Sequence, residues 1–156
     1  NVDFGEIAYE NEDYILSKSI PNPYLFKGWH NPEKNNSSVF RWTQKESFVL
    51  FRRPYKNSVL HIKGTVPSVH KKPIEIIIKI NDKLIDKFSS DESLDIDKQY
   101  PLDQYPLKNN NNELSIILSD TFVPNELWGY NDLRRLGMRI YGINIFPLKN
   151  IAKNNI

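Results

Sequence analysis

The run Ile74–Ile80 constrains the fold more than any other part of this sequence. Isoleucine occupies every second position of the run, and Glu75 and Lys79 fall between them. Alternate residues of a strand point to one face of a sheet, and β-branched side chains favour that conformation. No segment of the chain sustains the 3.6-residue spacing of an amphipathic helix. The sequence therefore predicts a protein built from strands, with the isoleucine face of this strand in the core.

Turn signals and further alternation complete an all-β prediction. Asn81 and Asp82 tolerate positive φ, so they predict a hairpin that returns through residues 84–88. We predict about eight or nine short strands in an antiparallel β-sandwich or barrel, with a jelly-roll-like sandwich as the first choice. The expected strands, besides one or two within 1–27, are 39–42, 47–52, 59–63, 74–80, 84–88, 94–97, 114–118 and 138–146, the last with a bulge near Gly142.

The length of 156 residues corresponds to one domain. We predict a β-sandwich over 25–148, an N-terminal extension or edge strands over 1–24, and a C-terminal tail over 149–156. We interpret residues 109–112 as a low-complexity loop. We interpret residues 120–136 as a loop at the rim of the sheet with one helical turn. Because the chain begins with Asn1 rather than methionine, we expect it to be a piece of a longer protein.

Composition argues against several classes of partner. The balance of 21 Lys+Arg against 19 Asp+Glu gives a net charge of +2, which is too even to predict binding to nucleic acid or to a membrane surface. Residues 51–56 interleave rings and cations, as single-strand platforms do, but a solvated strand end explains them better. No apolar run has the length of a membrane helix, so we expect no direct membrane insertion.

The sequence predicts no catalytic residue, metal or cofactor. It contains no cysteine, and its three histidines share no spacing with a known metal site. Glu33 and Asp132 are the one carboxylate pair suited to a glycosidase, and arginines lie close to both in the sequence. A neighbouring cation lowers a carboxyl pKa, whereas a general acid needs its pKa raised. A carbohydrate-active enzyme using this pair is therefore the least favoured alternative.

The stretch 28–43 concentrates two tryptophans, a histidine, a glutamate and an arginine around a polar insert. We interpret it as a loop that folds over the rim of the sheet and then enters the sheet. Together with three other motifs it resembles small β-sandwich modules attached to bacterial and archaeal glycosyltransferases and to other proteins of surface-polysaccharide assembly. The resemblance covers about residues 25–147. Its motifs are Gly28-Trp29-x-x-x-Glu33, Phe40-Arg41-Trp42-Thr43, Phe122-Val123-Pro124 and Asp132-x-Arg134-x-Leu136-Gly137.

The resemblance implies a non-catalytic accessory domain that contacts a glycan and is joined to a catalytic domain, itself a glycosyltransferase, in the same polypeptide. It also implies a cytoplasmic location, with the cell surface as the alternative. A different class stays open, namely a structural or oligomerising domain that pairs with a second copy or with the neighbouring enzyme. The candidate ligand-binding residues are Trp29, His30, Glu33, Arg41, Trp42, Trp128, Asp132 and Arg134.

Each candidate has two interpretations. Tryptophans in loops can stack on sugar rings while nearby polar groups bind the hydroxyls. Alternatively, Trp42 fills the core together with Phe40, and Arg41 bridges the carboxylates of Glu33 and Asp132. The structural role is favoured for Trp42 and Arg41, whereas Trp29, His30 and Trp128 stay open between the two roles.

Overall fold

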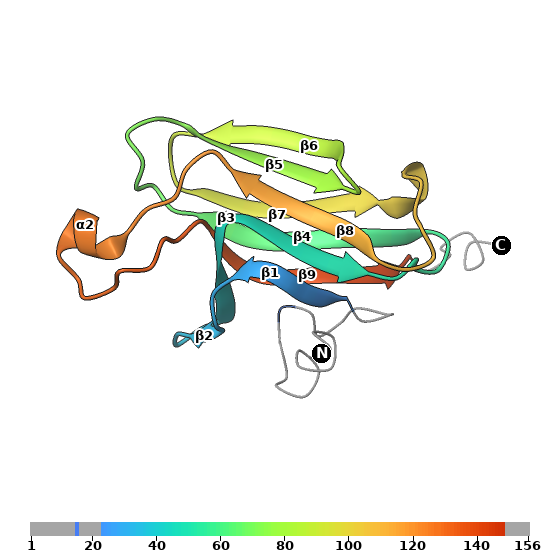
Figure 1. Ribbon diagram of the computed structural model, residues 1–156, viewed down its shortest axis with the longest axis horizontal. Helices are drawn as coiled ribbons and strands as arrows, with labels where there is room; N and C mark the ends of the chain where they lie inside the picture. The colour runs from blue at the N-terminus through green and yellow to red at the C-terminus, as the bar shows by residue number, and fades with distance from the viewer. Residues whose placement is uncertain (1–14, 16–22, 149–156) are drawn as a thin grey trace.

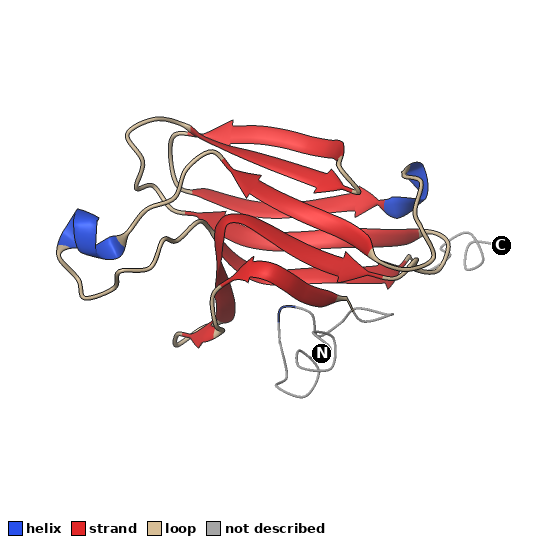
Figure 2. Ribbon diagram, in the orientation of Figure 1, coloured by secondary structure: helices blue, strands red, loops and turns tan. Residues whose placement is uncertain are grey.

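The computed structural model describes Ile15 and residues 23–148, and this part of the chain is all-β (Figures 1 and 2). The predicted N-terminal extension, apart from Ile15, Pro23 and Tyr24, and the predicted tail over 149–156 lie outside the described residues. The elements are β1 Tyr24–Trp29, β2 Glu33–Lys34, β3 Val39–Phe51, β4 Ser58–Val66, β5 Ile74–Ile80, β6 Lys83–Ser90, β7 Leu94–Pro101, the 3₁₀ helix η2 Leu102–Gln104, β8 Asn112–Leu118, α2 Pro124–Trp128 and β9 Arg139–Pro147.

Strand β3 joins the two halves of the fold. Its residues 46–51 pair with β8, whereas Arg41 and Trp42 pair with β9, all antiparallel. The hydrogen-bonded order is β6-β5-β8-β3-β9-β4-β7, and β1 and β2 also pair with β3. Because β3 belongs to both halves, the sheet folds over at its middle into two layers, which overlap in Figure 1. The antiparallel β-sandwich predicted from the sequence is confirmed.

The core lies between the layers. Ile74, Ile76, Ile78 and Ile80 of β5 are all almost fully buried, as their period-two spacing predicts. They pack in one apolar cluster with inward residues of β8, β4 and β9. Ile15 is fully buried in the same cluster. Burial of these side chains supplies most of the driving force for folding, at about 25 cal/mol per Å² of apolar surface.

The two edges of the folded sheet meet through side chains. Tyr100 of β7 donates a 2.6 Å hydrogen bond from Oη to Asp86 Oδ2 of β6. Lys98 Nζ lies 3.7 Å from the same carboxylate and 4.7 Å from the Phe88 ring centroid. Burial, together with the hydrogen bond to Asp86, raises the pKa of the Tyr100 phenol. The contacts nearly close the sheet into a barrel-like shape.

Two local features predicted from the sequence, a hairpin turn and a β-bulge, are present. Asn81 and Asp82 have φ of 49° and 65°, which is the positive-φ pair that a tight hairpin between β5 and β6 requires. In the β4–β9 ladder, Lys63 faces Gly142 and the next residue of β4 faces Ile140, so β9 carries an extra residue between them. This bulge confirms the irregularity expected near Gly142.

Two local predictions were wrong. The predicted strands 39–42 and 47–52 form one strand of 13 residues, Val39–Phe51, which excludes Arg52. Between them, Thr43 exchanges backbone hydrogen bonds with the segment 137–138, and Glu46 pairs with Ile117 of β8, so the polar stretch stays extended. Asn112 begins β8 and is fully buried, although the asparagine run predicts only a loop. Its side-chain amide donates to the carbonyl oxygens of Phe51 and Lys108, which satisfies the polar group inside the fold.

Candidate functional site

One end of the sandwich carries the motif residues. The connection 119–138, called here the rim loop, extends beyond the strands and includes α2 (Figure 1). Phe122 and Leu136 exchange backbone hydrogen bonds of 2.9 and 2.8 Å at its base, and the Gly137 N–H donates to Thr43 O at 2.7 Å. These bonds tie both ends of the loop to each other and to β3. The helical turn expected in this loop is present as α2.

A second apolar cluster lies beneath the rim loop. It contains Phe40, Trp42, Phe122 and Leu136, all buried. The Trp42 ring meets Phe122 edge-on, with centroids 5.5 Å apart, and the Arg139 guanidinium lies 5.1 Å over the same indole. Trp42 therefore takes the structural position that the sequence favoured, in this smaller cluster rather than in the core between the two layers.

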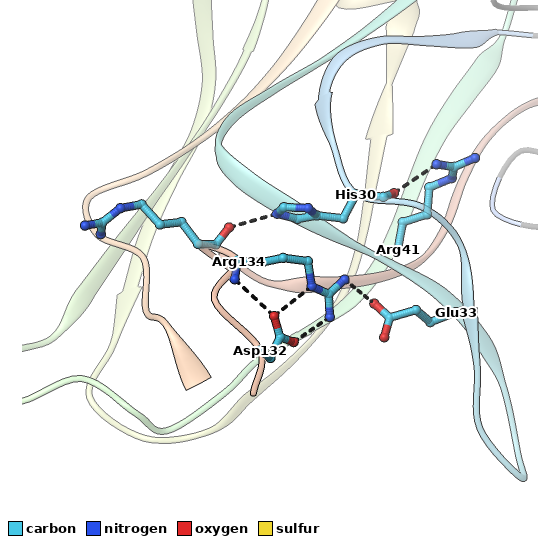
Figure 3. A network of polar contacts seen from close by, with 6 residues as sticks. His30, Glu33, Arg41, Asp132 and Arg134 are labelled. Atoms are coloured by element: carbon cyan, nitrogen blue, oxygen red, sulfur yellow. Dashed lines mark hydrogen bonds and ion pairs between the residues drawn. The ribbon is translucent and has the colours of Figure 1, made fainter. Parts of the chain in front are cut away.

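Arg134 binds both candidate carboxylates (Figure 3). Its Nη1 lies 3.0 Å from Glu33 Oε2, its Nη2 lies 2.7 Å from Asp132 Oδ2, and its Nε lies 3.0 Å from Asp132 Oδ1. The hydrogen bond from the Arg134 side chain lowers the pKa of Asp132 to about 2. The bond to Asp132, followed by the bond to Glu33, raises the pKa of the guanidinium above its ordinary value. All three side chains are about one-third exposed.

The predicted bridge by Arg41 is corrected by this geometry. Arg41 Nη1 donates a 2.9 Å hydrogen bond to the carbonyl oxygen of His30, and its guanidinium points away from the carboxylates in Figure 3. Arg41 and Trp42 pair with β9, whereas Arg134 follows Asp132 closely enough to form a fork on its carboxylate. The rim segments meet as predicted, but the bridging cation is Arg134.

Trp29 and His30 use their polar atoms within the fold. Trp29 Nε1 donates to the Phe48 carbonyl at 3.0 Å, and its half-buried ring packs against the main core. His30 Nε2 lies 2.8 Å from the Arg135 carbonyl, which can only accept, so this nitrogen carries the proton. Glycine is required at position 28, because its φ is 87° and a Cβ there would collide with Glu46 O.

Trp128 is the one predicted tryptophan that lies on the surface. Its side chain is 51% exposed, and the neighbouring Tyr130, which the sequence argument missed, is 63% exposed. Their ring centroids are 5.7 Å apart with planes inclined by 41°. Trp128 also rests edge-on against buried Phe122, at 5.9 Å. Leu127 and Leu133 are exposed on the same loop. A sequence signal for Tyr130 existed, because it is an aromatic residue in the same loop as Trp128.

Two cavities flank the start of the rim loop, and both are lined by Asp120 and Thr121. The larger has a volume of about 590 Å³ and lies between this segment and the β4–β5 loop, residues 67–73. The smaller has a volume of about 510 Å³ and is also lined by His30, Gln44, Lys45 and Arg135. Of the predicted site residues, His30 alone contributes to these two cavities.

The described residues include no group of three or more His, Asp or Glu side chains placed to hold a metal ion. None of the helices in the described ranges has the length and apolar character needed to cross a membrane. No protein-family model matches the chain, and no curated protein or solved structure matches it at a significant level. The site must therefore be interpreted from its own geometry.

Proposed function

We propose that this chain is a non-catalytic, carbohydrate-binding β-sandwich domain whose rim loop carries the binding surface. The exposed pair Trp128 and Tyr130 is the observation that carries the proposal. Aromatic faces supply apolar contact to the C–H faces of a sugar ring, and adjacent rings suit consecutive units of a chain. Exposed apolar groups gathered on one loop are typical of a surface that another molecule covers.

The Trp128–Tyr130 pair, called here the platform, is held in place by hydrogen bonds within the rim loop before any ligand binds. Asn125 Nδ2 donates to the Tyr130 carbonyl at 2.7 Å, and the Asn125 N–H donates to the Asp132 carbonyl at 2.9 Å. Gly129, with φ of 73°, ends α2 and turns the chain between the two aromatic residues. Arg134 then fixes Asp132 to Glu33 of β2. A preorganised surface loses less conformational entropy on binding, which favours a recognition role.

The chemistry of the carboxylates favours binding over hydrolysis. Asp132 has its pKa lowered to about 2 by the hydrogen bond from Arg134, whereas the acid of a glycosidase needs a raised pKa. The proposal places the domain beside a glycosyltransferase of surface-polysaccharide assembly, in the same polypeptide and facing the cytoplasm. That part rests on the resemblance of the four motifs alone. Self-association through Leu127 and Leu133 is the alternative use of the same surface.

A glycan array tests the proposal, with the chain and its Trp128→Ala and Tyr130→Ala variants as probes. Tyr55→Ala is the matched control, because Tyr55 is 66% exposed. Its turn also lies near η2, at the end of the strands opposite α2 (Figure 2). We expect binding to at least one glycan class, a loss of about tenfold in each rim variant, and no change in the control. A concentration-dependent dimer with no glycan bound would support the oligomerising alternative instead.

A further inference from the structure

We propose that the cavity of about 510 Å³ at the base of the rim loop binds an anionic sugar unit, one that carries a carboxylate or a phosphate. This inference rests on the proposed function and deepens it, because it names acidic glycans as the class that the domain recognises. The volume lies within the usual range of small-ligand sites, about 300–1,000 Å³.

Lys45 and Arg135 give this cavity its positive character. Both side chains line it and are exposed, and neither forms an ion pair with a residue in the described part of the chain. The adjacent Arg134, by contrast, is held by the carboxylates of Glu33 and Asp132. Two cations beside one hollow repel each other until an anion lies between them, so this lining favours a ligand of negative charge.

The one carboxylate in the lining does not cancel that charge. Asp120 Oδ1 accepts a 2.8 Å hydrogen bond from the Thr121 N–H, and its Oδ2 lies 3.8 Å from His70 Nδ1 in the wall of the larger cavity. Even without His30, two cations against one carboxylate leave an excess of one positive charge. The larger cavity is lined by two lysines, one aspartate and one glutamate, so it has no such excess.

The backbone that carries the two cations is fixed before a ligand binds. The Arg135 carbonyl oxygen accepts a 2.8 Å hydrogen bond from His30 Nε2. The next residue, Leu136, exchanges backbone hydrogen bonds with Phe122. Lys45 lies within the 13-residue strand β3. Both side chains therefore extend from ordered backbone, which lowers the entropy lost when they converge on a ligand.

The chemistry of the lining suits a charged sugar better than a bare anion. A planar guanidinium binds a carboxylate or a phosphate through two parallel N–H donors, and an ammonium adds a point charge. The lining also includes Gln44 and Thr121, whose amide and hydroxyl groups can bind the hydroxyl groups of the same sugar. A bare anion would use the cations and leave these neutral groups unused.

The cavity and the platform belong to the same loop. The chain from Tyr130 to Arg135 spans at most about 18 Å even when it is fully extended. An oligosaccharide of a few units can therefore place one ring on the platform and an acidic unit between Lys45 and Arg135.

Nuclear magnetic resonance titration of the ¹⁵N-labelled chain tests the site with matched probes. Glucuronate and glucose 1-phosphate are the anionic sugars, glucose is their neutral match, and acetate and inorganic phosphate are the bare anions. The backbone amide signals of Gln44, Lys45 and Thr121 report binding in the cavity. We expect at least one anionic sugar to shift them at millimolar concentration, with glucose and the bare anions about tenfold weaker or more. A response to one of the two anionic sugars alone identifies the charged group as carboxylate or phosphate.

Charge-removing variants and salt test the role of the two cations. Lys45→Met and Arg135→Met should each weaken the anionic sugar by about two- to fivefold, because both side chains are solvent-exposed. Arg52→Met and Lys56→Met are the matched controls, since both residues are exposed beside Tyr55 and should have no effect. Raising the ionic strength from about 0.01 M to about 0.15 M shortens the Debye length from about 30 Å to about 8 Å and should also weaken binding.

The outcomes separate this inference from the proposed function. If glucose or the bare anions bind as tightly as the anionic sugars, the inference is wrong. If array glycans bind the platform but no anionic sugar shifts the cavity signals, the inference is wrong while the proposed function stands. If an anionic sugar binds and Lys45→Met weakens it, but Trp128→Ala leaves array binding unchanged, the cavity stands and the platform is wrong. Binding of no glycan, neutral or anionic, contradicts both.

Discussion

Arg134 Nη1 lies 3.0 Å from Glu33 Oε2, although 101 positions separate the two residues in the chain. The same guanidinium forms a fork on Asp132 through Nε and Nη2. One cation therefore joins the short strand β2 to the rim loop that presents Trp128 and Tyr130. Planar, two-point contact of this kind fixes orientation as well as proximity.

Removing that cation should loosen the rim more than the core. Arg134→Met is expected to lower the free energy of unfolding by about 1 kcal/mol, because all three partners are partly exposed and solvent screens them. Urea denaturation measures the change. Arg135→Met is the matched control, since its side chain makes none of these contacts with Glu33 or Asp132, and an equal loss in both variants would contradict the assignment.

Lowering the pH should remove the stabilisation that the fold gains from the contact between Asp132 and Arg134. Arg134 lowers the pKa of Asp132 from 3.8 to about 2 in the folded protein. A carboxyl with a lowered folded pKa contributes stability that is complete above its unfolded pKa and is lost as pH falls through the folded value. The difference in melting temperature between wild type and Asp132→Asn should therefore shrink between pH 4 and pH 2. A difference that stays constant over this range would contradict the pairing.

The contact that nearly closes the sheet is testable at Tyr100. Tyr100→Phe keeps the ring but removes the donor to Asp86, leaving that carboxylate beside Lys98. We expect a loss of about 1 kcal/mol in the free energy of unfolding by chemical denaturation. Tyr55→Phe, at an exposed position, should have no measurable effect. Equal stability of the two variants would show that the hydrogen bond between β6 and β7 contributes nothing.

Alanine substitutions at Gly28 and Gly129 separate the cost of a positive φ from the cost of a steric clash with the backbone. Both have positive φ, but a Cβ on Gly28 would lie 2.0 Å from Glu46 O, whereas the space around Gly129 is open. Gly129→Ala should cost about 1–2 kcal/mol from its conformation alone. Gly28→Ala should cost about 3 kcal/mol or more, because backbone must also move. Thermal unfolding of both variants gives the comparison, and similar costs would contradict the close approach of β1 to β3.

Local patterns were enough to predict most of the strands but not their partners. The isoleucines of β5 and the Asn81-Asp82 turn depend on neighbours in the sequence, so their spacing predicted them correctly. The continuity of β3 depends on the backbone bonds of Thr43 to residues 137–138 and on the pairing of Glu46 with β8, which no local pattern encodes. The positions of individual strands could therefore be predicted from the sequence, whereas the order of the strands in the sheet required the structure.

The site shows the same division. That charged rim segments meet was correctly inferred from the motifs at Glu33 and Asp132, but the bridging arginine was not. Arg41 and Arg134 carry the same side chain, and the choice between them depends on the direction of each guanidinium in the folded protein.

The three indole N–H groups provide the most direct measurement of glycan recognition by the rim loop. Trp29 Nε1 is hydrogen-bonded to Phe48 O, Trp42 is buried, and Trp128 is exposed, so their resonances report three different environments. Titration with the glycan that gives the strongest array signal should shift the Trp128 indole resonance and leave the other two in place. A spectrum in which all three stay unmoved, or in which the indole of Trp29 or Trp42 moves without that of Trp128, would contradict the account.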